Sequence, residues 1–228
     1  MSTQPQTSFQ TLETRRFQHA LSGDSHREAF ESLIRKKFAE HHGAIIARFL
    51  PILVGVIDKN LPSAVAGISI ASEGPLLVES YLKQPVESEI RQLSDYRIDR
   101  QHIVEIGNLA ASSTRACQAL FIVLADVLYQ AGFKWVICTA TPLVQRQLKT
   151  MQFQPVLLGQ ADGLSLGEQR VYWGRYYDAS PKVLAGAIEP AVAHIRRKPH
   201  LQGTLDQYQD ELPAIVEVIS KSAREYAR

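Results

Sequence analysis

Ile103-Val-Glu-Ile-Gly-Asn-Leu-Ala-Ala111 is the stretch of the chain that decides the fold. It is an apolar run of strand length interrupted by a carboxylate, a glycine and an amide. Strict alternation would place Glu105, Gly107 and Leu109 on one face, with Asn108 on the other. A glycine inside a strand often marks a bulge or a close approach to the backbone. We therefore expect a strand whose end meets a ligand; a buried strand with one ion-paired glutamate is the alternative.

The residues that follow predict a strand-helix-strand unit. Residues 114–130 are apolar nearly all round, which is typical of a buried central helix, and Gly132 ends them. Residues 135–141 read as a buried strand, and a helix begins at Pro142. A helical crossover joins parallel neighbours, so we expect the two strands to lie side by side, in parallel, and to diverge towards their carboxyl ends.

The rest of the chain predicts further elements around this unit. Ser25 and Glu28 form a capping-box pattern before a helix that ends at Gly43. Two strands, at 50–57 and 64–70, are expected to form an antiparallel hairpin. The other expected elements are an extended segment at 76–82, a short helix at 85–90, strands at 156–158 and 170–177, and amphipathic helices at 191–197 and 212–226.

These patterns predict one α/β domain with two appendages. Residues 1–23 are polar and read as a flexible arm, residues 24–186 as the domain, and residues 187–228 as a helical extension that packs on it or dimerises. The first twenty-odd residues lack an apolar core of signal-peptide length, and no apolar run is long enough for a membrane span. Any membrane action would therefore be peripheral.

The composition is that of an ordinary globular protein: 45% of the 228 residues are hydrophobic, 21% are charged, and the net charge is +2. The small charge argues against nucleic-acid binding. Cys117 and Cys138 lie in apolar runs and read as core residues without a disulfide, which suits a reducing cytoplasm. The chain lacks the common nucleotide-binding, nucleophile-elbow and zinc-binding motifs, so neither a bound metal nor a permanent cofactor is expected.

Polar side chains gather at four places where strands are expected to end. Each of the four clusters named next also has a purely structural explanation, in the same order: an ion pair, strand-compatible threonines, a surface segment and core aromatics. The four clusters are Glu105 with Asn108, Thr139 with Thr141 on one strand face, Glu79 with Tyr81 on one face of an extended segment, and Trp173-Gly-Arg-Tyr-Tyr177.

Several motifs together resemble the thermostable hemolysin family over roughly 30–186. They are Glu-Ser-Tyr-Leu (79–82), Pro-Val-Glu (85–87), Val-Glu-Ile-Gly-Asn-Leu-Ala (104–110), Ala-Leu-Phe (119–121), Thr-Ala-Thr (139–141) and Trp-Gly-Arg-Tyr-Tyr (173–177). The resemblance implies a GNAT-like acyltransferase fold, with a mixed central sheet flanked by helices. It also implies kinship with acyl-homoserine-lactone synthases and N-acyl amino acid synthases.

The chain departs from the related enzymes at two positions. The lactone synthases carry an arginine three residues after the strand carboxylate, where this chain has Asn108. The acetyl-CoA enzymes carry a glycine-rich phosphate loop, where this chain has Ser-Ser-Thr-Arg (112–115). Helix amides and Arg115 could still hold a phosphate there, and the loop suits the phosphopantetheine arm of a carrier protein better than free CoA.

The resemblance implies an N-acyltransferase that moves a long acyl group, and not an amino-acyl group, from acyl-ACP or acyl-CoA to a small amine or amino-acid-like acceptor. Glu105 would take the amine proton, with Asn108 beside it. The implied donor-binding residues are Gly107 (a backbone N–H near the oxyanion), Arg115, Thr139 and Thr141, and the implied acceptor and tunnel residues are Glu79, Tyr81, Trp173, Tyr176 and Tyr177.

Two other functions remain open from the sequence. One is a non-catalytic, membrane-active hemolysin, although the C-terminal helices are balanced in charge. The other is a dimeric ligand-binding module, which would be favoured by an ion-paired and inaccessible Glu105. The expected location is the cytoplasm, with peripheral contact to the inner membrane and a homodimer left open.

Overall fold

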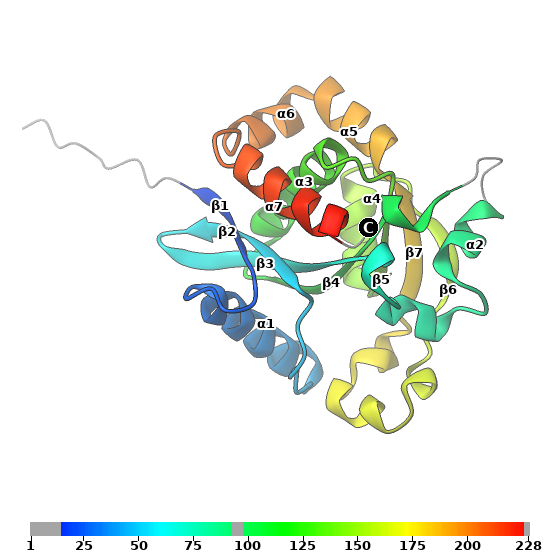
Figure 1. The fold of residues 1–228 in the computed structure, drawn as a ribbon. Coiled ribbons are helices and arrows are strands. Elements are labelled where there is room, and N and C mark those ends of the chain that lie inside the picture. Colours follow the sequence, from blue (N-terminus) through cyan, green and yellow to red (C-terminus); the bar gives the residue numbers. More distant parts are fainter. Residues whose placement is uncertain (1–14, 93–97, 226–228) are drawn as a thin grey trace, which may run out of the picture.

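The computed structural model of the chain describes residues 15–92 and 98–225. They form one seven-stranded sheet in the order β1-β2-β3-β4-β5-β7-β6 (Figure 1). The strands are β1 (Arg16–Ala20), β2 (Ile52–Asp58), β3 (Leu61–Ile70), β4 (Ile103–Ala111), β5 (Trp135–Ala140), β6 (Val156–Gln160) and β7 (Lys182–Ala187). Among these described strands only β4 and β5 pair in parallel. The expected hairpin (β2–β3), mixed sheet and parallel β4–β5 pair are confirmed.

Helices cover both faces of the sheet (Figure 1). The α-helices are α1 (Arg27–His42), α2 (Val86–Arg91), α3 (Thr114–Gln130), α4 (Pro142–Thr150), α5 (Ile188–Arg197), α6 (Pro199–Asp206) and α7 (Leu212–Glu225). The 3₁₀ helices are η1 (Ala71–Glu73), η2 (Leu77–Tyr81), η3 (Arg100–His102), η4 (Gly163–Trp173) and η5 (Tyr176–Ala179). Helix α1 lies on one side of the sheet, and α3 lies on the other with α5, α6 and α7.

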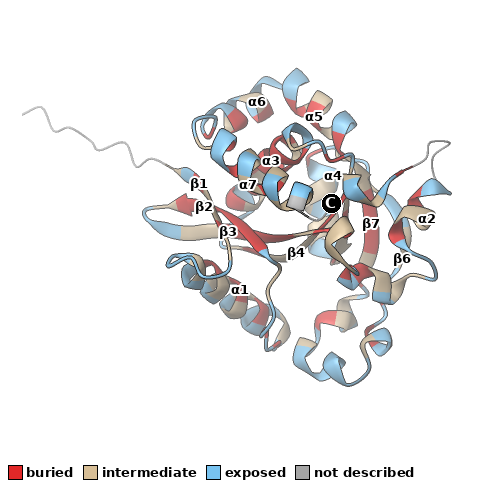
Figure 2. Cartoon of the chain, in the orientation of Figure 1, coloured by how far each residue is buried: buried red, intermediate tan, exposed pale blue. Residues whose placement is uncertain are grey.

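Three buried apolar clusters pack against the two faces of the sheet. Strands β2, β3 and β7 are largely buried, whereas the outward surfaces of the helices are exposed (Figure 2). On one side Phe30 and Ile34 of α1 pack against Leu53 of β2. On the other side Leu120 of α3 packs in a cluster with residues of β2, β3 and the C-terminal helices.

The C-terminal helices are part of the cluster that contains α3. Ile195 of α5, Leu205 of α6 and Ile219 of α7 belong to the same buried cluster as α3. Arg196 of α5 also forms an ion pair, at 3.1 Å, with the buried Asp126 of α3. Residues 187–225 therefore pack directly on the central helix.

At the N-terminus the structure corrects two expectations. Arg16–Ala20, inside the expected flexible arm, forms the edge strand β1, because Phe17 and Ala20 bury their side chains against the sheet. The capping box at Ser25 and Glu28 is wrong: α1 starts at Arg27 without a side-chain cap, and the Glu28 carboxylate accepts hydrogen bonds from Ser32 and Arg35 instead.

Two further expectations are corrected, and one strand was missed. The extended segment at 76–82 is wrong, because residues 77–81 form η2. The strand at 170–177 is wrong as well: Gly174, at φ +52°, passes so close to the end of α1 that a Cβ would collide with the His42 carbonyl oxygen, and the segment turns through η4 and η5. Strand β7 was not expected, although it pairs with both β5 and β6.

Candidate active site in the cleft between β4 and β5

A cavity of about 1780 Å³ is lined by residues from both sides of the sheet. It exists because the two parallel strands separate: their ladder ends at the Ile106–Cys138 pair, whereas β4 continues to Ala111. On one side the cavity is lined by parts of α1, η2, η4 and η5, and on the other by parts of α3, α4 and α5. The expected divergence of β4 and β5 is confirmed.

A bulge in β4 shapes the middle of the cavity. Asn108 adopts the left-handed conformation, at φ 49°, and the register shows Asn108 and Leu109 together opposite Ala66 of β3. Its side-chain Oδ1 accepts a hydrogen bond from the Leu50 N–H at 2.8 Å. The bulge expected from Gly107 is thus present, but the left-handed residue is the asparagine beside it.

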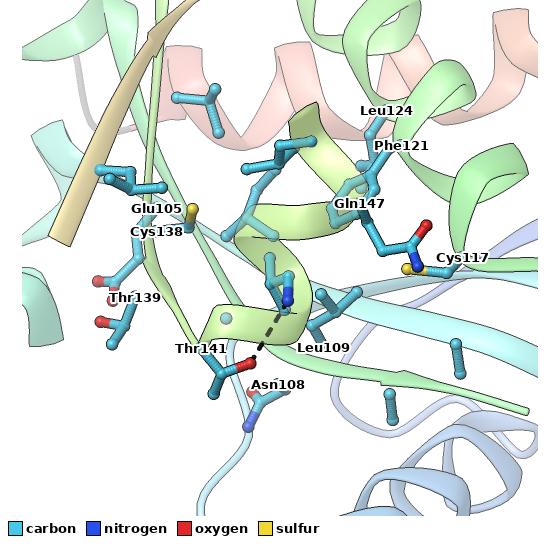
Figure 3. Close-up of a pocket in the computed structure, with 18 of the residues that line it drawn as sticks. Glu105, Asn108, Leu109, Cys117, Phe121, Leu124, Cys138, Thr139, Thr141 and Gln147 are labelled. Atoms are coloured by element: carbon cyan, nitrogen blue, oxygen red, sulfur yellow. Dashed lines mark hydrogen bonds between the residues drawn. The ribbon is translucent and has the colours of Figure 1, made fainter. Parts of the chain in front are cut away.

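The bulge also changes which side chains share a face. Leu109 packs into the core on the α3 side, whereas Asn108 bonds to the loop on the α1 side. Strict alternation was therefore wrong here, and Asn108 lies on the same side of the sheet as Glu105 (Figure 3).

The loop before β2 crosses the sheet at two paired glycines. Gly67 of β3 and Gly107 of β4 are paired neighbours. A Cβ added to Gly67 would come within 2.8 Å of the Leu50 side chain, and one added to Gly107 would come within 3.0 Å of it. Glycine at both positions lets the loop lie directly on the backbone.

Glu105 is a buried acid in contact with the cavity. Its side chain is 3% exposed, and its Oε2 accepts a hydrogen bond from the Leu77 N–H at 2.7 Å. Burial raises the pKa of Glu105 to about 7; the N–H groups of Leu77 and Val78 oppose this rise, and the charge of Glu79 adds to it. No cation forms an ion pair with it in the described chain, so the carboxyl is suited to exchange a proton near neutral pH.

Glu79 does not reach the cavity. It accepts two hydrogen bonds from the Arg100 guanidinium, at 2.6 and 2.7 Å, and others from the N–H groups of Leu76 and Val86. Burial acts to raise its pKa, but the bonds from Arg100 and the backbone outweigh burial and lower it to about 2. Glu79 therefore holds η2 in place, and η2 in turn presents the Leu77 N–H to Glu105.

The aromatic residues expected at the site lie on the α1 side of the sheet. Tyr81, Trp173 and Tyr176 line the cavity there. Tyr177 stands behind them, and its hydroxyl shares a hydrogen bond of 2.6 Å with that of Tyr81. Burial, together with Tyr177, raises the pKa of Tyr81, which keeps this phenol neutral. These side chains wall the space next to Glu105.

The two threonines line the cavity in different roles. Thr139 shares a face of the sheet with Glu105, since Glu105 pairs with Ile137 two residues before it (Figure 3). Thr141 lies beyond the end of β5 and caps α4, where its Oγ1 accepts a hydrogen bond from the Val144 N–H at 3.5 Å. The expectation that both share one strand face is wrong.

Arg115 lies outside this cavity. It is exposed on the first turn of α3 and borders a small void of about 20 Å³ beside Tyr208. Ser112, Ser113 and Thr114, just before it, do line the large cavity. The structure thus brings the helix terminus to the cavity but not the arginine.

Sequence reasoning missed much of the cavity lining, including two parts that bear on function. One is an apolar wall on the α3 side, formed by Phe121, Leu124, Leu128, Val144, Leu148 and Phe153. The helical spacing of the first three on α3 was the available signal. The other is Arg48, in the loop before β2, which no pattern in the sequence marks.

The described residues contain no helix long and apolar enough to cross a membrane. Within the same residues no group of three or more His, Cys, Asp or Glu side chains is arranged to hold a metal ion.

In sequence comparisons a family model described as Thermostable hemolysin matches residues 20–192. No curated protein matches the chain.

Solved structures show the same fold at low identity. FeeM, an N-acyl amino acid synthase from uncultured soil microbes, has a TM-score of 0.54 and 13% identity, covering 79% of this chain and 95% of its own. The AHL synthase LasI has a TM-score of 0.51 and 9% identity, covering 76% of this chain and 88% of its own. BjaI, a CoA-dependent acyl-homoserine lactone synthase solved with SAM and isopentyl-CoA, has a TM-score of 0.51 and 10% identity, covering 88% of this chain and 89% of its own. The expected GNAT-like fold is confirmed.

Proposed function

The chain belongs to the thermostable hemolysin family, and we propose that it is an N-acyltransferase. It moves a long acyl chain from a CoA or carrier-protein thioester to a small amine. The observation that carries this proposal is a single cavity with a buried acid, Glu105, on one side of the sheet and an apolar wall on the other.

The cavity is large enough for two substrates at once. Ordinary small-molecule pockets have about 300–1,000 Å³, and this cavity has about 1780 Å³. The apolar wall on the α3 side suits a fatty acyl chain, since it offers carbon surface from Phe121, Leu124 and Leu148. The acceptor takes the other side, between Glu105 and the aromatic residues Tyr81 and Tyr176.

The reaction places the thioester in the gap between β4 and β5. Glu105, ionised, takes a proton from the acceptor ammonium or from the attacking amine, and the nitrogen attacks the carbonyl carbon. A backbone N–H near Gly107 faces the oxyanion that forms. The carbon–sulfur bond then breaks to leave the amide, and the leaving thiolate takes the proton that Glu105 accepted, so the free thiol departs and Glu105 is ionised again.

The remaining site residues support these groups. Asn108 fixes the bulge that shapes the gap, and Thr139 and Thr141 line its β5 side. The backbone N–H groups of Ser113 and Thr114 are our candidates for the phosphate end of the donor, because the N-terminus of a long helix attracts anions. Arg115 would reach that phosphate only from outside the cavity.

The test is mass spectrometry of lipid extracts from cells that express the chain or its Glu105→Gln variant. We expect N-acyl amines with the native chain and a loss of roughly 10²–10⁴-fold in the variant, the usual range for a positioned acid or base. If the variant forms as much product, Glu105 has no catalytic role. If no acylated amine forms while the purified chain still lyses lipid vesicles, the non-catalytic hemolysin is the correct function.

A further inference from the structure

The cavity is cationic apart from its one acid. Across residues 15–92 and 98–225 the charged side chains that line it are Glu105, Lys37, Arg48 and Arg197. Arg197 lies on α5, on the far side of the sheet from Glu105. The side that holds Glu105 therefore also holds two cations, Lys37 and Arg48.

Of these two cations, Arg48 is the one available to a ligand. The Lys37 ammonium donates a hydrogen bond to Glu40 at 2.8 Å and already has a counter-charge. Arg48 has no ion pair with any described residue and is exposed at the cavity. No other carboxylate of the described chain lines this cavity to compensate it.

Arg48 is held close to the reacting strand. It lies in the loop that crosses the sheet at Gly67 and Gly107, and its carbonyl oxygen accepts a weak hydrogen bond from Asn108 Nδ2 at 3.5 Å. Two residues further on, the Leu50 N–H donates to the same asparagine at 2.8 Å. The loop backbone that carries the guanidinium is thus tied to the strand that carries Glu105.

The chemistry of these two groups describes an acceptor. A guanidinium binds a carboxylate with two parallel hydrogen bonds, a geometry that an ammonium cannot offer. In the proposed reaction Glu105 takes a proton from an amine, so the acceptor must carry an amine group. We propose that Arg48 is a specificity residue that selects acceptors with a carboxylate beside the reactive amine, which are free amino acids. This inference rests on the proposed acyltransferase function and names the acceptor class.

The aromatic wall indicates a suitable probe. Phe38, Trp173 and Tyr176 line the same side of the cavity and favour an apolar or aromatic acceptor side chain. Phenylalanine and 2-phenylethylamine differ only by the carboxylate, so together they isolate its contribution.

The experiment compares kcat/KM for these two acceptors with decanoyl-CoA and the purified full chain. We expect phenylalanine to be preferred on the order of 10–100-fold, the range for a hydrogen bond to a charged group. Arg48→Met should lose most of this preference through a higher KM for phenylalanine, and Arg48→Lys should keep part of it. The matched control is Arg175→Met, which removes a nearby exposed arginine that does not line the cavity.

A binding measurement separates this inference from the acyltransferase proposal. Calorimetry with N-decanoylphenylalanine and N-decanoyl-2-phenylethylamine needs no turnover. Tighter binding of the carboxylate compound, lost in Arg48→Met, supports Arg48 even if no acyl transfer occurs, in which case the acyltransferase proposal alone fails. Turnover of both acceptors with equal efficiency, or an unchanged preference in Arg48→Met, overturns the Arg48 inference and leaves the acyltransferase standing.

Discussion

The side-chain oxygen of Asn108 accepts a hydrogen bond from the Leu50 N–H at 2.8 Å, and this bond joins the loop before β2 to the bulge of β4. The residue also has φ 49°, a conformation that glycine and asparagine tolerate better than alanine does. Asn108 therefore contributes to stability in two ways: through its hydrogen bond to Leu50 and through its tolerance of the left-handed backbone conformation.

Asn108→Ala removes both contributions, whereas Asn108→Gly removes only the hydrogen bond. We expect losses of about 2 kcal/mol for alanine and about 1 kcal/mol for glycine in urea unfolding. An alanine variant as stable as the glycine variant would show that the left-handed backbone is not strained by a side chain.

The pKa of Glu105, raised to about 7 by burial, predicts the pH dependence of the reaction. The ionised form accepts the amine proton, so kcat/KM should rise with pH and show an inflection near 7. Glu105→Gln should be slower and lack that inflection. An inflection that persists in the variant would assign it to the acceptor or to another group.

The same pKa shift also predicts an effect on stability. A carboxyl whose native pKa lies above 4.5 binds its proton more tightly when folded, so the ionised form destabilises the fold as pH rises from 4.5 through about 7. Relative to the native chain, Glu105→Gln should gain about 3 kcal/mol between pH 4.5 and pH 8. Urea unfolding at both pH values measures this difference, and a constant gap between the two proteins would contradict it.

Glu79 should behave in the opposite way. Its pKa is lowered to about 2, so its contribution to stability is complete above pH 4.5 and is lost as pH falls through 2. Glu79→Gln should lose about 2 kcal/mol at pH 7, less than for a fully buried pair because both ends are partly exposed. Glu87→Gln, which leaves the Glu79–Arg100 pair intact, is the control and should lose less.

Leu148 should limit the length of the acyl chain. It lines the apolar wall from α4, a helix with no fully buried residue, and its own side chain is only partly buried at the edge of the core, so a larger side chain would extend into the cavity. With Leu148→Trp we expect kcat/KM for a C16 thioester to fall on the order of 10–100-fold relative to C8. Lys149→Trp, on the exposed neighbour outside the cavity lining, should leave the chain-length profile unchanged.

The central fold was predictable because its signals are local. The apolar run at 103–111, the apolar helix after it and the next strand indicated the parallel pair and its divergence. Edge strand β1 and strand β7 were missed, since each has only five or six residues and depends on partners distant in the sequence. Residues 170–177 look like a strand, but Gly174 must pass against the end of α1, a tertiary constraint that periodicity does not contain.

The site was predictable only in part, for a related reason. Glu105 stood out as a carboxylate within an apolar strand. Glu79 pairs with Arg100, 21 residues away, and Arg115 borders a separate small void beside Tyr208; both depend on side-chain directions set by the packed fold. Arg48 carries no signal in the sequence, because its place at the cavity follows from a loop that crosses two glycines.

The opening in the sheet between β4 and β5 has a kinetic consequence. With the donor on the α3 side and the acceptor on the α1 side, as proposed, the two substrates occupy different parts of the cavity, and neither must leave before the other binds. The amine can attack a thioester still attached to its carrier, so transfer occurs in a ternary complex without an acyl-enzyme. The product then spans the sheet, with its polar head on one side and its tail on the other, and product release becomes the natural slow step.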